Sequence, residues 1–133
     1  MDTNVTRREA RELAFVLLFE KTFTDESVSE IMEKAREARE VEADDFAARV
    51  AAGAADKLPE LDAIIEPALQ NWSKERLTRV ALTVLRLAVY EMKFEEDTPV
   101  SVAINEAVEI AKKFGGADDA SFINGVLGSI ART

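Results

Sequence analysis

Apolar side chains recur every three to four residues along most of the chain, which is the period of an amphipathic helix. No segment alternates apolar and polar residues with a period of two for more than a few positions. Helices are predicted at about residues 7–22, 28–39, 44–57, 59–70, 74–93, 99–114 and 120–131. The pattern therefore predicts an all-α protein, a single compact bundle of about seven helices formed by residues 1–133.

The predicted starts of three helices carry recognisable capping residues. Thr6-x-x-Glu9 and Ser27-x-x-Glu30 have the form of a capping box, in which the hydroxyl accepts from the backbone and the glutamate reaches back. Thr98-Pro99 predicts an N-cap followed by a first-turn proline. Within 59–70, Pro67 is expected to break or shorten the helix.

Glycines suggest how the last two helices end and pack. Gly115-Gly116 predicts a left-handed C-terminal cap for the helix at 99–114, and Asp118 or Asp119 could cap the next helix. Gly125 lies inside the last predicted helix, where glycine lowers stability by up to about 1 kcal/mol. We therefore expect close helix packing at Gly125.

The segment 74–93 is apolar on more than one face, so it is expected at the centre of the bundle. Its longest apolar stretch, 80–92, is interrupted by Arg86 and Glu91 and is much shorter than the roughly 20 residues that span a bilayer. The apolar run 13–19 follows acidic as well as basic residues and lacks a small-residue cleavage site, unlike a signal peptide. A cytoplasmic protein without membrane contact is expected.

Composition narrows the possible chemistry. Of 133 residues 47% are hydrophobic, which is too many for a disordered chain, and none is Cys or His. Disulfides, thiolate or imidazole zinc sites and histidine acid–base catalysis are therefore excluded, and no metal or cofactor is expected. Carboxylates cluster at Asp44-Asp45, 95–97 and Asp118-Asp119, but neighbours on a helix point about 100° apart and do not converge on one metal or water. Catalysis is not expected.

Charge is distributed unevenly along the chain. The net charge is −9, from 17 Lys and Arg against 26 Asp and Glu. Residues 25–66 hold 13 acids and 5 bases, so this segment alone carries −8 and the rest carries −1. The N-terminal arginines and Lys112-Lys113 could therefore share a face turned away from the acidic segment.

Four segments together resemble the bacterial NusB family: 7–14 (RREARELA), 84–92 (VLRLAVYEM), 99–115 (PVSVAINEAVEIAKKFG) and 122–127 (FINGVL). The resemblance spans essentially the whole chain. It implies a seven-helix fold without enzymatic activity and binding to the boxA element of nascent RNA jointly with NusE, the tenth protein of the small ribosomal subunit. It also implies an antitermination complex with RNA polymerase that reads through terminators, notably in ribosomal RNA operons.

The resemblance implies that Arg7, Arg8 and Arg11 bind RNA. Positions 7 and 11 are one helical turn apart and 8 is three residues from 11, so the three guanidiniums could follow one phosphate backbone. Arginine suits this role because its planar, permanently charged fork binds phosphate bidentately. Glu9, where some members carry another arginine, should weaken the attraction. Alternatively, these arginines only solvate the start of a helix.

A second RNA contact is implied at the corner between the last two helices, at Lys112, Lys113, Asp119 and Phe122. An exposed loop flanked by lysines and an aromatic residue could hold an unstacked base. Asp119 could equally serve as a helix cap, and Phe122 as a core residue.

For NusE, the family surface combines the first helix with the region between the fourth and fifth helices. Phe19 falls where some members have tyrosine, and Ala81 where some have an acidic residue, so polar contacts could be missing here. Both could instead be core residues. The resemblance also leaves open a homodimer formed through the RNA-binding surface. A different class of function also stays open: an acidic adaptor that engages a basic partner through 25–66, with negligible RNA contact.

Overall fold

The computed structural model describes residues 6–37, 45–69 and 77–133, and these contain seven α-helices, one 3₁₀ helix and no strand. The elements are α1 (Arg7–Lys21), α2 (Val28–Glu37), α3 (Asp45–Asp56), α4 (Leu58–Ile65), η1 (Glu66–Leu69), α5 (Arg79–Phe94), α6 (Val100–Phe114) and α7 (Ala117–Ala131). The predicted all-α bundle is confirmed. No helix in the described ranges is long and apolar enough to cross a membrane.

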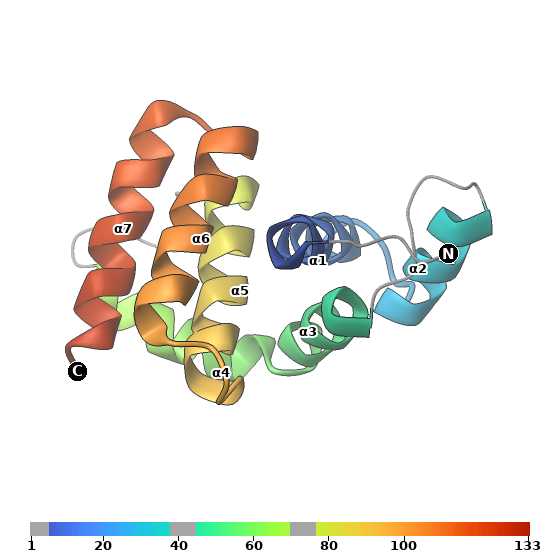
Figure 1. Ribbon diagram of the computed structural model, residues 1–133, viewed down its shortest axis with the longest axis horizontal. Helices are drawn as coiled ribbons and strands as arrows, with labels where there is room; N and C mark the ends of the chain where they lie inside the picture. The colour runs from blue at the N-terminus through green and yellow to red at the C-terminus, as the bar shows by residue number, and fades with distance from the viewer. Residues whose placement is uncertain (1–5, 38–44, 70–76) are drawn as a thin grey trace.

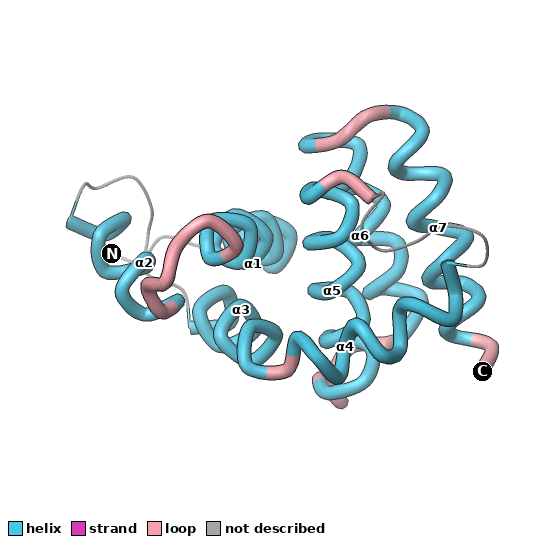
Figure 2. The backbone as a smooth tube through the Cα atoms, turned by 180° about the vertical axis from the view of Figure 1, so that it is seen from behind, coloured by secondary structure: helices cyan, strands magenta, loops and turns pink. Residues whose placement is uncertain are grey.

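The helices form two groups that meet along α1, α3 and α5 (Figure 1). α5, α6 and α7 stand side by side, with α4 running beneath them, while α1 and α3 pack together and against α5. α2 lies at the far end of the molecule from α7, as the view from behind also shows (Figure 2). α5 contacts helices of both groups, which confirms its expected central position.

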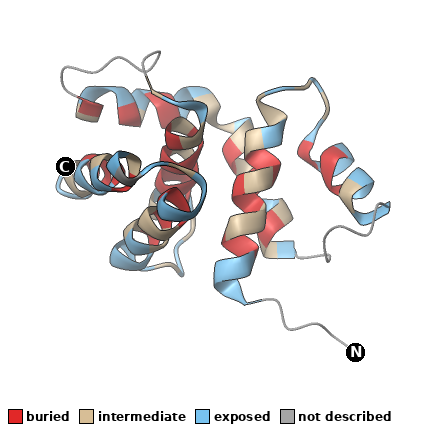
Figure 3. Ribbon diagram, turned by 90° about the horizontal axis from the view of Figure 1, so that it is seen from above, coloured by how far each residue is buried: buried red, intermediate tan, exposed pale blue. Residues whose placement is uncertain are grey.

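Buried residues make up most of α5 and lie along the facing sides of α1 and α3 (Figure 3). α5 alone buries Val84, Leu85 and Val89 completely or almost completely. Because interior side chains are packed at nearly crystalline density, these contacts hold the two helical groups in one arrangement. That arrangement determines which charged residues of α1 face α5, α6 or water.

The predicted capping boxes are present at both sites. In α1, the Glu9 backbone N–H donates to Thr6 Oγ1 at 3.0 Å, and the Thr6 N–H donates to Glu9 Oε1 at 2.9 Å. In α2, the Glu30 N–H donates to Ser27 Oγ at 3.1 Å and the Ser27 N–H to Glu30 Oε1 at 2.7 Å. Local sequence therefore determines where these helices begin.

Several predicted boundaries are wrong by a few residues. α5 begins at Arg79, because the Thr78 side chain accepts from the Ala81 N–H, and predicted residues 74–76 lie outside the described ranges. α7 begins at Ala117 rather than at 120. α4 ends at Ile65 and gives way to η1, which contains Pro67. Predicted residues 38, 39, 44 and 70 also lie outside the described ranges.

Three predictions about caps and glycines are corrected. Thr98 does not cap α6, since Pro99 takes the N-cap position and the Thr98 hydroxyl donates to Glu91 Oε2 at 3.2 Å. Gly115 has extended backbone (φ −114°, ψ −163°) rather than a left-handed conformation. A Cβ atom at Gly125 would meet nothing within 4 Å, so no close helix packing requires that glycine.

Candidate nucleic-acid interface

The three N-terminal arginines lie in the first two turns of α1 and their side chains meet different neighbours. The capping box at Thr6 and Glu9 begins the helix just before them. Helical spacing then directs Arg8 towards α6, Arg11 towards α5 and Arg7 towards α3. Each arginine therefore has its own set of contacts.

Arg11 is part of the packing between α1 and α5. Its Nε donates to both Glu91 oxygens at 2.9 and 3.0 Å, and its Nη2 donates to Oε2 at 2.8 Å. The two side chains are only 10% and 7% exposed, and the Thr98 hydroxyl donates to the same carboxylate. Because the Arg11 fork is occupied and buried, the expectation that three guanidiniums follow one RNA backbone does not fit the geometry.

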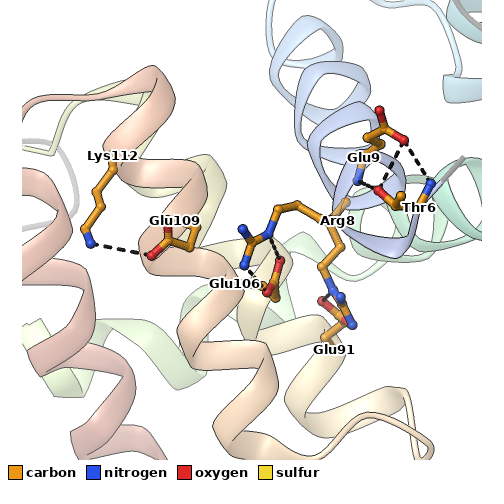
Figure 4. A network of polar contacts seen from close by, with 8 residues as sticks. Thr6, Arg8, Glu9, Glu91, Glu106, Glu109 and Lys112 are labelled. Atoms are coloured by element: carbon orange, nitrogen blue, oxygen red, sulfur yellow. Dashed lines mark hydrogen bonds and ion pairs between the residues drawn. The ribbon is translucent and has the colours of Figure 1, made fainter.

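Arg8 forms a second bidentate pair, at the edge between α1 and α6 (Figure 4). Its Nε and Nη2 donate to the two oxygens of Glu106 at 3.0 and 2.9 Å. The Arg8 side chain is 53% exposed, whereas that of Glu106 is 13% exposed. The hydrogen bond and charge of Arg8 hold the pKa of Glu106 below its usual value, and the same pair raises the pKa of Arg8. Glu106 therefore joins α6 to α1.

Arg7 makes no ion pair with any carboxylate of the described residues. Its guanidinium lies 4.0 Å from the centroid of the Phe46 ring on α3. A guanidinium over an aromatic face is held by a cation–π interaction, which leaves the edges of its fork available to hydrogen-bond acceptors. Of the three arginines, Arg7 is thus the one whose charge no described carboxylate offsets.

The two lysines at the end of α6, Lys112 and Lys113, are exposed, and Lys113 reaches α1. Lys113 Nζ lies 2.8 Å from Glu12 Oε1 on α1, and its side chain is 57% exposed. Lys112 is 60% exposed and pairs at 3.4 Å with Glu109 on its own helix (Figure 4). The structure therefore brings Arg8 and Lys113, about a hundred residues apart in sequence, to one edge where α1 meets α6.

Asp119 and Phe122 occupy positions with structural roles. Asp119 Oδ2 accepts from the Gly116 backbone N–H at 3.1 Å, which satisfies one of the free donors at the start of α7. Phe122 is half-buried against the core and lines a cavity with Leu69 and Val126. Asp119 therefore caps α7, and much of the Phe122 side chain packs against the core.

Phe19 and Ala81, the two residues expected to contact NusE, differ in exposure. Phe19 is half-buried and contacts Phe15 and Phe23, with ring centroids 5.6 and 5.1 Å apart. Ala81 is 1% exposed, so its side chain belongs to the core. It faces inward because the Thr78 cap directs the first turn of α5 against the bundle.

Sequence reasoning missed two aromatic residues that lie against arginines, Phe23 and Phe46. Phe23 is 60% exposed and carries the Arg79 guanidinium 4.6 Å from its ring centroid. Its spacing of four residues from Phe19 could have indicated a shared helix face. Phe46 lies against Arg7 and Arg11 of α1, which could not be read from the local sequence. Its third arginine neighbour, Arg49, is three residues further along α3 and was within reach of a local reading.

The carboxylate clusters considered for catalysis serve contacts of other kinds. Glu95 forms an ion pair with Arg49, Asp119 caps α7, and Asp44 lies outside the described ranges. Among the described residues, no three Asp or Glu side chains gather closely enough to hold a metal ion.

A model of the NusB family matches residues 8–132. The chain belongs to the NusB family. It is 41% identical to the transcription antitermination protein NusB of Clostridium botulinum (strain Loch Maree / Type A3), over 95% of this chain and 99% of that protein. It is 43% identical to the NusB of Listeria monocytogenes serotype 4b (strain CLIP80459), over 94% of this chain and 95% of that protein.

Solved NusB structures have the same fold. The T. maritima NusB structure superposes with a TM-score of 0.83 at 37% identity, covering 99% of this chain and 93% of that one. A crystal structure of the antitermination factors NusB and NusE in complex with dsRNA contains a chain that matches with a TM-score of 0.82 at 28% identity. That match covers 95% of this chain and 96% of the other. The fold predicted from the resemblance is therefore confirmed.

Proposed function

We propose that this NusB-family protein is a transcription antitermination factor that binds boxA-type RNA together with NusE, and so helps RNA polymerase read through terminators, notably in ribosomal RNA operons. The observation that carries the proposal is the family match over 8–132, together with one solved structure of the antitermination factors NusB and NusE in complex with dsRNA. The proposed role is binding, and no catalytic step or cofactor is part of it.

The RNA surface is proposed along the edge where α1 meets α6. Arg8 and Lys113 lie on opposite sides of this edge, and both side chains are more than half exposed. Lys112 at the end of α6, and Asp119 and Phe122 in the first turns of α7, are proposed as a second part of the RNA contact. Each cation that reaches a phosphate releases counterions, so this surface predicts salt-dependent binding.

Arg11 is proposed to act indirectly. Its bidentate pair with Glu91 fixes α1 against α5, and thereby sets the direction in which Arg7 and Arg8 leave the helix. Arg11 is therefore assigned a positioning role rather than a phosphate contact.

The NusE surface is proposed at the end of α1 and the start of α5. Phe19 and the exposed Phe23 supply an aromatic patch, and Arg79 lies over Phe23. Aromatic and arginine side chains are the residue types that most often dominate protein–protein interfaces. Ala81 is buried, so we propose that its exposed neighbours Thr78 and Arg79 contact NusE in its place.

One specific observation favours the alternative, an acidic adaptor with negligible RNA contact. Arg8 and Arg11 are each neutralised by a glutamate, and residues 25–66 carry a net charge of −8. In that case the acidic helices would engage a basic partner and the arginines would serve only to hold the fold.

The deciding experiment is the affinity for a boxA-type RNA, measured with and without NusE over a series of salt concentrations. The proposed function predicts affinity that increases when NusE is added and falls as salt rises. Arg8→Ala should weaken binding and lower the salt slope by about one. Unchanged affinity and slope in that variant, with intact NusE binding, would support the adaptor instead.

A further inference from the structure

A cavity of about 200 Å³ opens where the start of α1, the start of α3 and the loop between α5 and α6 meet. Three of its lining residues are arginines, Arg7, Arg11 and Arg49, and they surround the ring of Phe46. Their guanidinium carbons lie 4.0, 5.6 and 5.6 Å from that one ring centroid. This cluster lies on the α3 side of α1, and Val102 in the first turn of α6 also lines the cavity.

The three arginines differ in how far their charge is offset. Arg11 is buried and its Nε and Nη2 donate to Glu91, so the pair adds little net charge to the cavity's attraction for an anion. Arg7 has no ion pair with a described carboxylate and is held by its contact with Phe46. Arg49 is 56% exposed and uses Nη1 to pair with Glu95, while no described residue accepts from its Nε or Nη2. Two guanidinium forks therefore present edges to one cavity that no described residue occupies.

The acidic groups at the cavity are Glu95 and Asp97. Glu95 is mostly buried, with 12% exposure, and it occupies one side of Arg49, whereas Asp97 is exposed on the loop. An anion bound between the arginines would therefore compete with Glu95 for Arg49. Removing the charge of Glu95 should strengthen anion binding, although the same change removes an ion pair.

We propose that Arg7 and Arg49, positioned on Phe46, form a second phosphate-binding site for the RNA backbone on the α1–α3 face, and that Glu95 limits its strength. The inference rests on the proposed function, since it extends the RNA path from the α1–α6 edge around the start of α1. Planar guanidiniums whose orientation is already set bind phosphate with little further ordering. Phe46 is a positioning residue here, because its ring holds Arg7 rather than touching RNA.

The test measures the affinity of the full chain, with NusE present, for a boxA-type single-stranded RNA oligonucleotide over a salt series. Arg49→Gln should raise the Kd severalfold and lower the salt slope by about one, and Arg7→Gln should do the same. Glu95→Gln should lower the Kd. Two substitutions in one cavity that move affinity in opposite directions cannot both be explained by partial unfolding.

Two further variants test whether Phe46 acts by positioning Arg7, and whether the loss of any exposed arginine weakens RNA binding. Phe46→Leu keeps an apolar side chain, so it should raise the Kd while leaving the salt slope close to that of the parent. The matched control is Arg36→Gln, which removes an exposed, ion-paired arginine from α2 and should change neither quantity. Thermal unfolding of each variant checks that the fold is retained.

The outcomes distinguish this inference from the proposed function. If Arg49→Gln and Glu95→Gln bind like the parent while Arg8→Ala binds weakly, the second site is overturned and the proposed function stands. If Glu95→Gln weakens binding as Arg49→Gln does, the pair is structural and the second site is also overturned. If the parent chain binds no RNA with or without NusE, both proposals fail.

Discussion

Arg8 and Arg11 stand three residues apart in α1, and each forms a bidentate pair with a glutamate from the other helical group. The Arg11–Glu91 pair is 10% and 7% exposed, whereas Arg8 in the Arg8–Glu106 pair is 53% exposed. The chemistry is the same and the distances agree within a few tenths of an ångström. Access of water is the main difference between them.

That difference assigns the two pairs to different functions. A buried charge that loses its partner is left without water, so the inner pair is needed for the folded state. An exposed pair is screened and can exchange its partner for another anion. A single arginine-rich motif can therefore supply both a structural contact and a binding contact, and only the partner helix decides which.

The strongest test of the difference between the buried and the exposed pair is the substitution Arg11→Ala. Among the described residues, it leaves the buried Glu91 carboxylate with the Thr98 hydroxyl as its one polar side-chain partner, so we expect the free energy of unfolding to fall by about 3–5 kcal/mol. Urea unfolding followed by circular dichroism measures the loss. Replacing both partners with apolar residues, Arg11→Met and Glu91→Leu, should recover much of it. A loss below about 1 kcal/mol in Arg11→Ala would mean that water reaches the pair.

The next largest effect is expected at a second buried contact, where α3 meets α5. A Cβ atom at Gly53 would lie 2.2 Å from Tyr90 Oη and 2.5 Å from Cζ. The Tyr90 ring is buried and stacked on Phe94, so it has little room to move. Gly53→Ala should therefore destabilise the fold by about 1–3 kcal/mol, measured in the same urea assay.

A matched control for that substitution is Gly125→Ala. Gly125 is exposed inside α7, and a Cβ there would meet nothing within 4 Å. Alanine restricts the unfolded chain and favours the helix, so a gain of about 0.5–1 kcal/mol is expected. If both glycine variants shift stability in the same direction, the close approach of α3 and α5 is not the cause.

These two glycines show where reasoning from sequence succeeds and fails. Helices, capping boxes and the central position of α5 could be predicted because they depend on spacing within one segment. The need for glycine at position 53 depends on Tyr90, which lies on another helix. The expectation of close packing was therefore placed at Gly125, where helix propensity gave a local signal, and missed at Gly53.

For the candidate RNA-binding residues as well, the sequence predicts what depends on one segment and misses what depends on a contact between helices. The basic residues of α1 and α6 were identified from the sequence, and their exposure at Arg8, Lys112 and Lys113 agrees with a surface role. The burial of Arg11 could not be predicted, because its partner Glu91 is 80 residues away. The cluster on Phe46 was missed for the same reason.

Arg8→Ala tests the exposed side of the comparison. Little change in the unfolding free energy is expected, because water can solvate Glu106 once Arg8 is gone. Affinity for boxA-type RNA should fall severalfold and the salt slope should become shallower by about one. A variant that is strongly destabilised, with the salt slope unchanged, would show that the outer pair behaves like the inner one.

The smallest effect concerns pH. Arg8 holds the pKa of Glu106 below its ordinary value of 4.5, so folding favours the ionised carboxylate. This contribution is fully present above pH 4.5 and is lost as pH falls through the lowered pKa of the folded state. Glu106→Gln removes it, so the stability difference between parent and variant should shrink as pH falls below 4.5. Urea unfolding at steps from pH 7 to pH 3 measures that difference, with Glu60→Gln on α4 as the control for losing one exposed carboxylate. A difference that stays constant across this range would mean that Glu106 is not ionised preferentially in the folded protein, and that the outer pair contributes nothing to stability through its charge.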